Sequence, residues 1–251
     1  MQFTEIVFAV FMTVVFSLYW LVLRCWVKAQ NWLLLGASYL FYGWWDWRFL
    51  GLIMLTTVTT YGAALCAHRR YGKLVTAANI VVNLGILVAF KYLNFFSENL
   101  KRLFDILGWN LDWFTIDVLL PVGISFYTFQ AIAYSVDVYK GKVKACTDPV
   151  AFATFIAYFP QLVAGPIERA SQLLPQIVSP RRWNEGQAVS GLRMILFGVM
   201  KKVCIADMLA LYADRLYAAN LDNPLTALAA GVVFSLEIYC DFSAYSEIAR
   251  G

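Results

Sequence analysis

The sequence predicts an all-α, polytopic transmembrane protein of about seven or eight helices, some of them broken or re-entrant. Hydrophobic residues make up 61% of the 251 residues and charged residues only 14%, whereas soluble domains average about 45–50% apolar and about 25% charged residues. Several apolar runs approach the ~20 residues that a spanning helix needs. Polar residues and prolines interrupt some runs. Because lipid cannot satisfy such groups, they must face protein or a water-filled cavity, which excludes a simple anchor.

Eight segments are candidate membrane helices. Five fit the spanning length or come close to it: Ile6–Leu23, Phe49–Ala67, Leu74–Phe90, Leu119–Val136 and Pro149–Ile167. Three are shorter or interrupted by charges: Asn31–Trp45, Gly191–Ala213 and Pro224–Ala249. The N-terminal segment Ile6–Leu23 has no basic residues before it and no small-residue cleavage site after it. We therefore expect it to be a retained helix and not a signal peptide. We expect residues 1–251 to form a single transmembrane domain.

Between two of these segments, residues 91–117 repeat apolar side chains at helical spacing. This pattern indicates either an amphipathic helix lying on the membrane surface or a helix packed onto neighbouring spans.

Basic residues gather in alternate loops between the apolar runs. They are Arg24 and Lys28, then Arg69, Arg70 and Lys73, then Lys140, Lys142 and Lys144. The positive-inside rule places these loops in the cytoplasm and the N-terminus outside. A net charge of +4 distributed in this way indicates membrane orientation and not nucleic-acid binding. The five cysteines have no CxxC spacing, so neither a disulfide framework nor a metal site is expected.

A polar stripe runs along the predicted helix at residues 119–138. Tyr127, Gln130, Tyr134 and Asp137 follow at i, i+3, i+7 and i+10, which places all four on one helix face. Such a stripe can line a substrate path, or it can form hydrogen bonds between helices. Both interpretations stay open.

The segment Phe159–Arg169 contains two prolines and a glycine. Proline removes a backbone donor and clashes with the preceding turn, so the helix is expected to break here beside a cavity or packed protein. Gln161 is therefore a candidate cavity-lining residue. Arg169 either holds an anionic group or extends its side chain to the lipid headgroups.

Acidic residues interrupt the last apolar segment. Glu237, Asp241 and Tyr245 follow at i, i+4 and i+8 and so share a helix face. Acids within a membrane are costly and need partners; the candidates are Lys201, Lys202 and Arg193. The alternatives are a structural ion pair and a catalytic or proton-relay role.

Several ordered motifs resemble the membrane-bound O-acyltransferase (MBOAT) family, in its alginate O-acetyltransferase branch. They are Pro121–Gln130, Asp137–Gly141, Phe159–Arg169, Gly198–Ala206 and Tyr239–Gly251, with the aromatic stretch Ser38–Trp47. The resemblance extends over essentially the whole chain. It implies the N-terminal portion of a helical membrane fold that surrounds a funnel and tunnel.

The resemblance also implies an activity: transfer of an acyl group, expected to be acetyl, to hydroxyls of an exported polysaccharide such as alginate. No cofactor is expected to be bound, and the acyl donor is acetyl-CoA or an acyl carrier. The implied partners are membrane lipid, periplasmic acetylation proteins and the polysaccharide acceptor, with no nucleic acid. The implied location is the bacterial inner membrane, with multiple passes and a periplasmic N-terminus.

The family's essential histidine lies beyond the motif that Tyr239–Gly251 matches, so no catalytic residue is assigned within this chain. His68 is the sole histidine and matches no catalytic position of the family. The chain alone is therefore expected to be inactive, because acyl transfer needs a base of near-neutral pKa. The substrate-binding candidates are Gln130, Tyr134, Asp137, Gln161, Arg169, Asp241 and Tyr245. A transporter or channel, or a non-catalytic membrane adaptor, is the alternative function.

Overall fold

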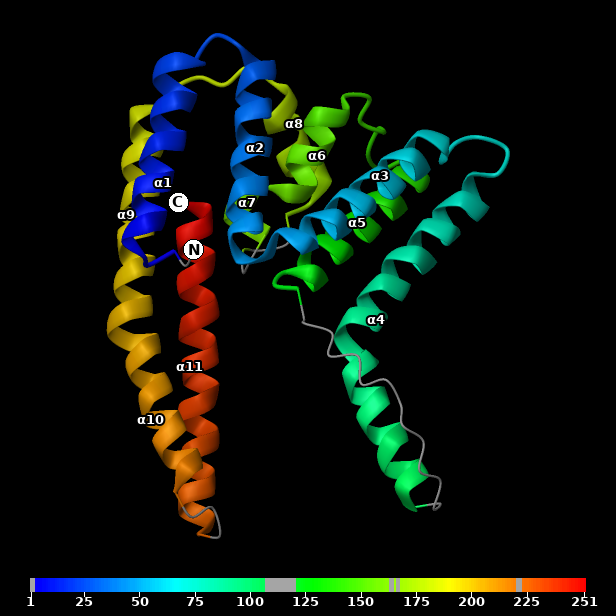
Figure 1. The fold of residues 1–251 in the computed structure, drawn as a ribbon. Coiled ribbons are helices and arrows are strands. Elements are labelled where there is room, and N and C mark those ends of the chain that lie inside the picture. Colours follow the sequence, from blue (N-terminus) through cyan, green and yellow to red (C-terminus); the bar gives the residue numbers. More distant parts are fainter. Residues whose placement is uncertain (1–2, 107–120, 163–164, 166–167, 220–222) are drawn as a thin grey trace. The chain divides into compact units, whose positions relative to one another are not determined.

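A computed structural model describes residues 3–106, 121–162, 165, 168–219 and 223–251 (Figure 1). Helices dominate these ranges, and no strand occurs within them, which confirms the all-α prediction. The principal helices are α1 (Ile6–Ser17), α2 (Val27–Asp46), α3 (Leu50–Cys66), α4 (Gly72–Ile106), α5 (Ile124–Tyr139), α6 (Pro149–Ala157), α7 (Phe159–Leu162), α8 (Ala170–Val178), α9 (Glu185–Lys201), α10 (Asp207–Ala218) and α11 (Pro224–Arg250). Two π-helical segments, η1 (Leu18–Val22) and η3 (Lys202–Ala206), extend α1 and join α9 to α10.

The helices form two compact units. The first consists of Met1–Trp45, Tyr158–Ile167 and Val178–Gly251, and the second of Asp46–Ala157 and Glu168–Ile177. Unit 1 therefore contains α1, nearly all of α2, and α7, α9, α10 and α11. Unit 2 contains α3 to α6 and nearly all of α8. That residues 1–251 form one transmembrane domain stays a prediction.

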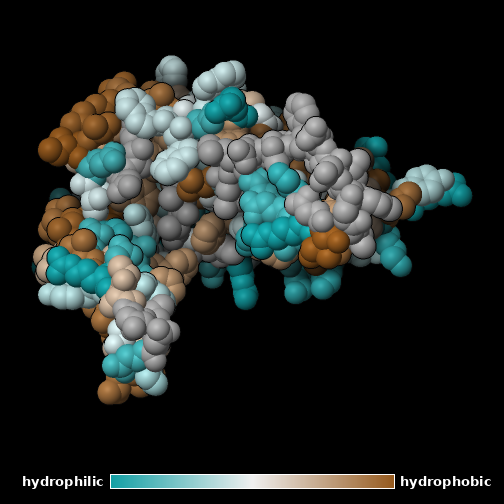
Figure 2. All heavy atoms as spheres, turned by 60° about the horizontal axis from the view of Figure 1, so that its bottom comes forward, coloured by the Kyte–Doolittle hydropathy of each residue, from teal (hydrophilic) through white to brown (hydrophobic). Residues whose placement is uncertain are grey.

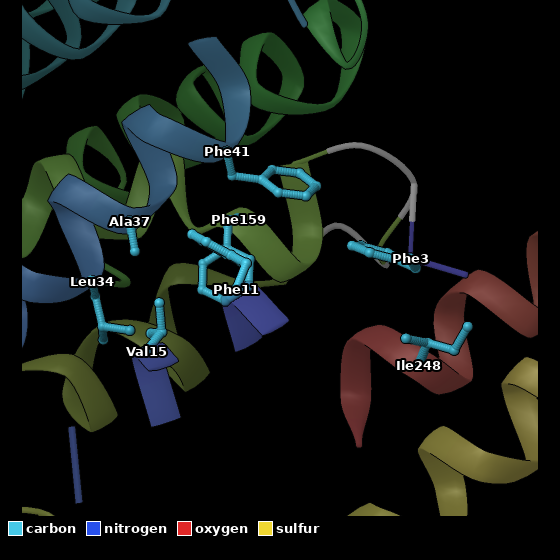
Figure 3. Packing of buried hydrophobic residues seen from close by; sticks show 8 residues of the cluster. All are labelled: Phe3, Phe11, Val15, Leu34, Ala37, Phe41, Phe159 and Ile248. Atoms are coloured by element: carbon cyan, nitrogen blue, oxygen red, sulfur yellow. The ribbon is translucent and has the colours of Figure 1, made fainter. Parts of the chain in front are cut away.

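Aromatic side chains form the core of unit 1. Phe11, Phe41 and Phe159 come from α1, α2 and α7 and point toward one another (Figure 3). Their ring centroids lie 5.4–6.1 Å apart, the range in which aromatic pairs stabilise each other beyond the area they bury. The cluster also contains Phe3, Val15, Leu34, Ala37 and Ile248. These contacts connect the first two helices to α7 and to the end of α11.

Unit 2 is built on a hairpin of α3 and α4, against which α5 packs. The short turn between α3 and α4 makes these two helices antiparallel. The third helix, α5, contacts both of them, and α6 packs against α3 and α5. Unusually for a helix bundle, side chains of threonine, asparagine and serine occupy much of the α3–α4–α5 contact: Thr56, Thr57, Thr60, Thr76, Asn79, Asn83, Thr128 and Ser135 are all buried.

Among the residues that the structure describes, three helical stretches are long and apolar enough to cross a membrane: Val27–Cys66, Gly72–Phe104 and Pro224–Arg250. Two shorter apolar stretches are Ile6–Val22 and Pro149–Leu162. Large apolar side chains are exposed on these helices, including Ile6 at 83% and Leu225 at 75%. Figure 2 shows extended apolar patches on the face it presents. Such an exterior suits lipid and not water, in agreement with a membrane protein.

The structure changes three of the predicted elements. Residues 72–106 form one continuous helix. Up to Ile106, therefore, the predicted span Leu74–Phe90 is not followed by a separate helix on the membrane surface. Residues 107–117 of the predicted surface helix lie outside the described ranges. The predicted span Pro149–Ile167 breaks at Tyr158, between α6 and α7, and the second proline of the predicted break lies outside the described residues. Helix α8 follows it and was not predicted.

Candidate functional site

Two consecutive lysines lie where α9 passes into the π-helical segment η3. Lys201 ends α9 and Lys202 begins η3. Single-turn π-helices inside α-helices occur frequently at functional sites. Both lysines are largely buried, with side chains only 16% exposed, so their charges need partners from a neighbouring helix.

Helix α11 supplies those partners on two opposite flanks. Helical spacing places Ala244 and Ile248 in the middle of the face that meets α9. Asp241 and Tyr245 lie on one side of this line, and Ser243 and Glu247 on the other. A β-carbon added at Gly198 of α9 would lie 2.8 Å from the Ala244 carbonyl oxygen. The two backbones therefore approach closely between the flanks.

Each lysine reaches a different flank of α11. Lys202 Nζ lies 2.5 Å from Asp241 Oδ1 and 2.9 Å from Asp207 Oδ1. Lys201 Nζ donates to Glu247 Oε1 at 2.6 Å and to Ser243 Oγ at 3.0 Å. We call these six residues, together with Tyr245, the lysine cluster.

The partial burial of the lysine cluster determines how much its ion pairs contribute to stability. Asp241 and Glu247 keep 31% and 30% of their side-chain surface exposed. Removing one partner of a fully buried pair costs about 3–5 kcal/mol, whereas exposed pairs contribute roughly 0–1 kcal/mol. These pairs lie between the two limits. They therefore stabilise the α9–α11 contact and fix the orientation of the acids.

The ring of Tyr245 contacts the ammonium group of Lys202. Lys202 Nζ lies 5.3 Å from the ring centroid, within the range of a cation–π contact. The Tyr245 ring also contacts the ring of Phe3, at 5.6 Å between centroids. The predicted residues Asp241 and Tyr245 thus share one lysine as a partner. Glu237, from the same predicted stripe, has no ion pair among the described residues.

A third cation, the half-buried Arg181, connects the loop before α9 to the first two helices. Arg181 Nη1 donates to Gln30 Oε1 at 3.2 Å, and its Nη2 donates to Asn31 Oδ1 at 2.7 Å. The guanidinium also lies over the ring of Tyr19, 5.5 Å from the centroid. Burial lowers the pKa of Arg181, because removal from water penalises the charged form.

The amide of Gln30 connects Arg181 to the π-helical end of α1. Its Nε2 donates to the Tyr19 carbonyl at 3.1 Å, while its Oε1 accepts from Arg181. Gln30 and Asn31 are 0% and 2% exposed. These three residues were not predicted as a group, since the bond joins residues about 150 positions apart. The only sequence signal was the pair of amides at the start of an apolar helix.

The predicted stripe on α5 faces other parts of unit 2. Gln130 Nε2 donates to the Phe155 carbonyl of α6 at 3.0 Å. Tyr134 Oη accepts from the Cys146 backbone N–H at 2.9 Å, and its ring lies 4.8 Å from that of Phe152. Both side chains are buried. These geometries correspond to hydrogen bonding between segments, and contact with a substrate stays a prediction.

The other three predicted residues lie in different surroundings. Asp137 is half-buried near the end of α5, where its carbonyl accepts from the Lys142 N–H at 2.9 Å. Gln161 in α7 buries its Oε1, and no hydrogen-bond partner occurs for it in the described ranges. Arg169 is exposed at the start of α8. The structure therefore groups Asp241 with Tyr245 and Gln130 with Tyr134.

Nothing in the described part of the chain resembles a metal site: no group of three His, Cys, Asp or Glu side chains is placed to hold an ion. His68 is exposed in the turn between α3 and α4.

Comparison with known proteins identifies relatives over most of the chain. It is 39% identical over 233 residues to "Probable alginate O-acetylase AlgI" of Azotobacter vinelandii, covering 89% of this chain and 46% of that protein. The namesake from Pseudomonas aeruginosa is 38% identical over 231 residues, covering 89% of this chain and 44% of that protein. The "Peptidoglycan O-acetyltransferase" of Helicobacter pylori is 32% identical, covering 88% and 46%. The chain thus spans about half the length of the curated relatives it matches. No protein-family model matches it.

Proposed function

We propose that the chain belongs to the membrane-bound O-acyltransferases, in their alginate O-acetylase branch, and that it is part of an enzyme that acetylates an exported polysaccharide. The observation that carries this proposal is the extent of the match. Relatives named for two different polymers, alginate and peptidoglycan, align with nearly nine-tenths of the chain. Transfer of an acetyl group to a hydroxyl of a glycan polymer is what their names share.

The proposed reaction is attack by an acceptor hydroxyl on the acetyl carbonyl of a thioester donor, acetyl-CoA or an acyl carrier. A C–O bond forms and the C–S bond breaks. The hydroxyl proton passes to a base, and the sulfur leaves as a thiol or thiolate. A base of near-neutral pKa suits this step, and histidine supplies one. His68 is exposed among basic residues, so we assign the base to the part of such proteins that this chain does not span.

Within this proposal the lysine cluster is a positioning device. Its ion pairs hold the acids and Tyr245 of α11 at fixed places inside an otherwise apolar helix. Charged side chains inside membrane helices usually mark substrate or proton pathways. The pairing therefore supports a role for this end of α11 beside the acetyl-transfer site.

The proposed setting is the bacterial inner membrane, with the N-terminus in the periplasm and the basic loops in the cytoplasm. This orientation places a cytoplasmic acetyl donor and an exported acceptor on opposite sides of the protein. Periplasmic acetylation proteins are the proposed partners that receive or deliver the acetyl group.

The test is an acetyl-transfer assay in membranes. A full-length protein containing this sequence, supplied with labelled acetyl-CoA, its periplasmic partners and alginate, is expected to label the polymer. Residues 1–251 expressed alone, at the same membrane level, are expected to give no labelling. Labelling by residues 1–251 alone would overturn the assignment of the base. Ion or solute flux without labelling by the full-length protein would overturn the acetyltransferase proposal itself.

A further inference from the structure

Two basic loops of unit 2 come from different parts of the sequence and lie at the same end of the unit. Asn79 of α4 donates to Thr60 of α3 at 3.4 Å and to Ser135 of α5 at 2.8 Å, so these residues lie at one depth. From there α3 and α5 run on to Cys66 and Tyr139, about 6–9 Å along their axes. Figure 1 shows α3 and α5 side by side in the same direction, with α4 returning. The turn after α3 and the loop after α5 therefore leave the unit on one side.

The loop after α5 is held against this end of the unit. Near its start, Gly141 has a φ of +70°, a left-handed conformation that lets the chain reverse. Near its end, the Cys146 N–H donates to Tyr134 Oη at 2.9 Å, and the Thr147 carbonyl accepts from Tyr61 Oη at 2.8 Å. The loop thus crosses from α5 to the last two turns of α3.

Basic side chains gather on the turn and on the loop. The turn and the start of α4 supply Arg69, Arg70 and Lys73, and the loop supplies Lys140, Lys142 and Lys144. All six are exposed, and we call them the basic surface. Along the loop, exposed Lys142 and Lys144 alternate with half-buried Val143 and Ala145, which directs both ammonium groups outward.

Acidic side chains balance only part of this positive charge. Within the described ranges, none of the six basic residues forms an ion pair. The carboxylate of Asp148 accepts from the N–H groups of Val150 and Ala151 at the start of α6, and Asp137 is half-buried. Six basic and two acidic residues account for the whole net charge of +4. Positive charge concentrated in this way attracts an anionic partner.

Exposed apolar side chains beside the basic surface indicate what kind of anion it meets. Leu65 in the last turn of α3 is 42% exposed, Leu74 in the first turn of α4 is 69% exposed, and Tyr71 between them is 63% exposed. Leucines at these helix ends suit acyl chains, and tyrosine rings prefer the membrane–water interface. The long basic side chains can therefore extend to the depth of the lipid headgroups. A soluble polyanion has no apolar part to match these neighbours.

We propose that the basic surface binds the headgroup phosphates of anionic phospholipids. Clusters of about four to eight Lys and Arg residues directly beside membrane spans bind such headgroups, and each residue adds to the affinity. The bound lipid holds the turn after α3 and the loop after α5 at the membrane surface. This binding does not depend on acetyl transfer.

A lipid titration of the full-length protein in a neutral detergent tests the proposal. Fluorescently labelled phosphatidylglycerol should bind more tightly than phosphatidylcholine with the same label and acyl chains, which has no net charge. Lys142→Gln combined with Lys144→Gln should weaken phosphatidylglycerol binding roughly 30-fold and leave phosphatidylcholine binding unchanged. Added salt should reduce the difference between the two lipids, because it screens exposed charges.

The matched control removes two charges from another basic loop. Arg24→Gln combined with Lys28→Gln changes two exposed residues of unit 1 and should leave phosphatidylglycerol binding close to that of the unaltered protein. Equal losses in the two double variants, or equal affinity for the two lipids, would overturn the proposal. So would a loss of coenzyme A binding without a loss of phosphatidylglycerol binding, since the surface would then take a soluble phosphate. If the lysine variant does not fold, Arg69→Gln combined with Arg70→Gln carries the same expectation.

Discussion

At the residue scale, the lysine cluster depends on two neighbouring side chains that reach opposite sides of one helix. Consecutive residues of a helix point about 100° apart, and the lysine stem is long enough to use that difference. Lys201 reaches Glu247, and Lys202 reaches Asp241. Shortening either acid or replacing either lysine would therefore release one flank of α11 and leave the other in place.

Cys146 gives a residue-scale prediction that depends on pH. The residue is 8% exposed, and burial raises the pKa of its thiol because the thiolate loses hydration. We expect Cys146 in a single-cysteine variant to react with iodoacetamide more slowly at pH 8 than exposed Cys25 does, with its rate rising to higher pH. The folded state favours the neutral form of the Cys146 thiol, and this preference adds to the free energy of unfolding. The contribution is present below the unfolded pKa of about 8.5 and is lost as pH rises through the folded pKa. Equal rates at the two cysteines would contradict the burial of this loop.

Sequence reasoning found those polar contacts of the candidate residues whose signal is local. Asp241 and its lysine partner were predicted, because acids in an apolar helix need cations and the preceding segment offered few. Gln130 and Tyr134 were recognised by their shared face, but their partners, the Phe155 carbonyl and the Cys146 N–H, are backbone groups that no sequence pattern indicates. Arg181 was missed, since its amide partners lie near the other end of the chain.

At the element scale, the close contact of α9 and α11 depends on Gly198, a glycine in the last turn of α9. Glycine weakens a helix by about 1 kcal/mol relative to alanine, so its presence needs a reason in packing. At Gly198 an added β-carbon would lie 2.8 Å from both the Ala244 carbonyl oxygen and Ile248 Cγ1. The absence of a side chain is what allows the lysines to reach both flanks of α11.

A pair of glycine-to-alanine variants tests this element contact. Gly198→Ala should lower Tm by several degrees, because overpacking a close contact costs about 1–3 kcal/mol and exceeds the gain in helix propensity. Gly231→Ala on α11 is the control, since nothing lies within 4 Å of its added β-carbon. It should leave Tm unchanged or raise it. If both variants shift Tm equally, α9 and α11 do not meet at Gly198.

Helix positions were more predictable than helix interruptions. Apolar length located most of the spans, and proline correctly indicated that the segment from Pro149 is broken. The continuation of α4 to Ile106 was not foreseen, because an amphipathic pattern does not say whether a helix leaves the membrane or continues straight. Neither π-helical segment has a local sequence signature.

At the scale of the whole molecule, two features distinguish this chain from a set of simple anchors. Apolar side chains cover much of the exterior, while ion pairs, amides and hydroxyls are placed inside each unit. Burying polar and charged groups within a membrane protein is costly, and such groups usually serve a function. Together with relatives that are named alginate O-acetylase and peptidoglycan O-acetyltransferase, this distribution supports the proposal that the chain is part of a membrane enzyme.

The most direct test of the account is acetyl transfer by the full-length protein carrying Asp241→Asn. Asparagine keeps the shape of the aspartate side chain and removes the negative charge that pairs with Lys202. We therefore expect polymer acetylation to fall roughly tenfold, a loss of about 1.4 kcal/mol in transition-state stabilisation. The matched control is Asp214→Asn at an exposed position of α10, which should keep full activity. Both are compared at equal membrane levels. Full activity of Asp241→Asn at a normal level would contradict the assignment of the lysine cluster to the acetyl-transfer site.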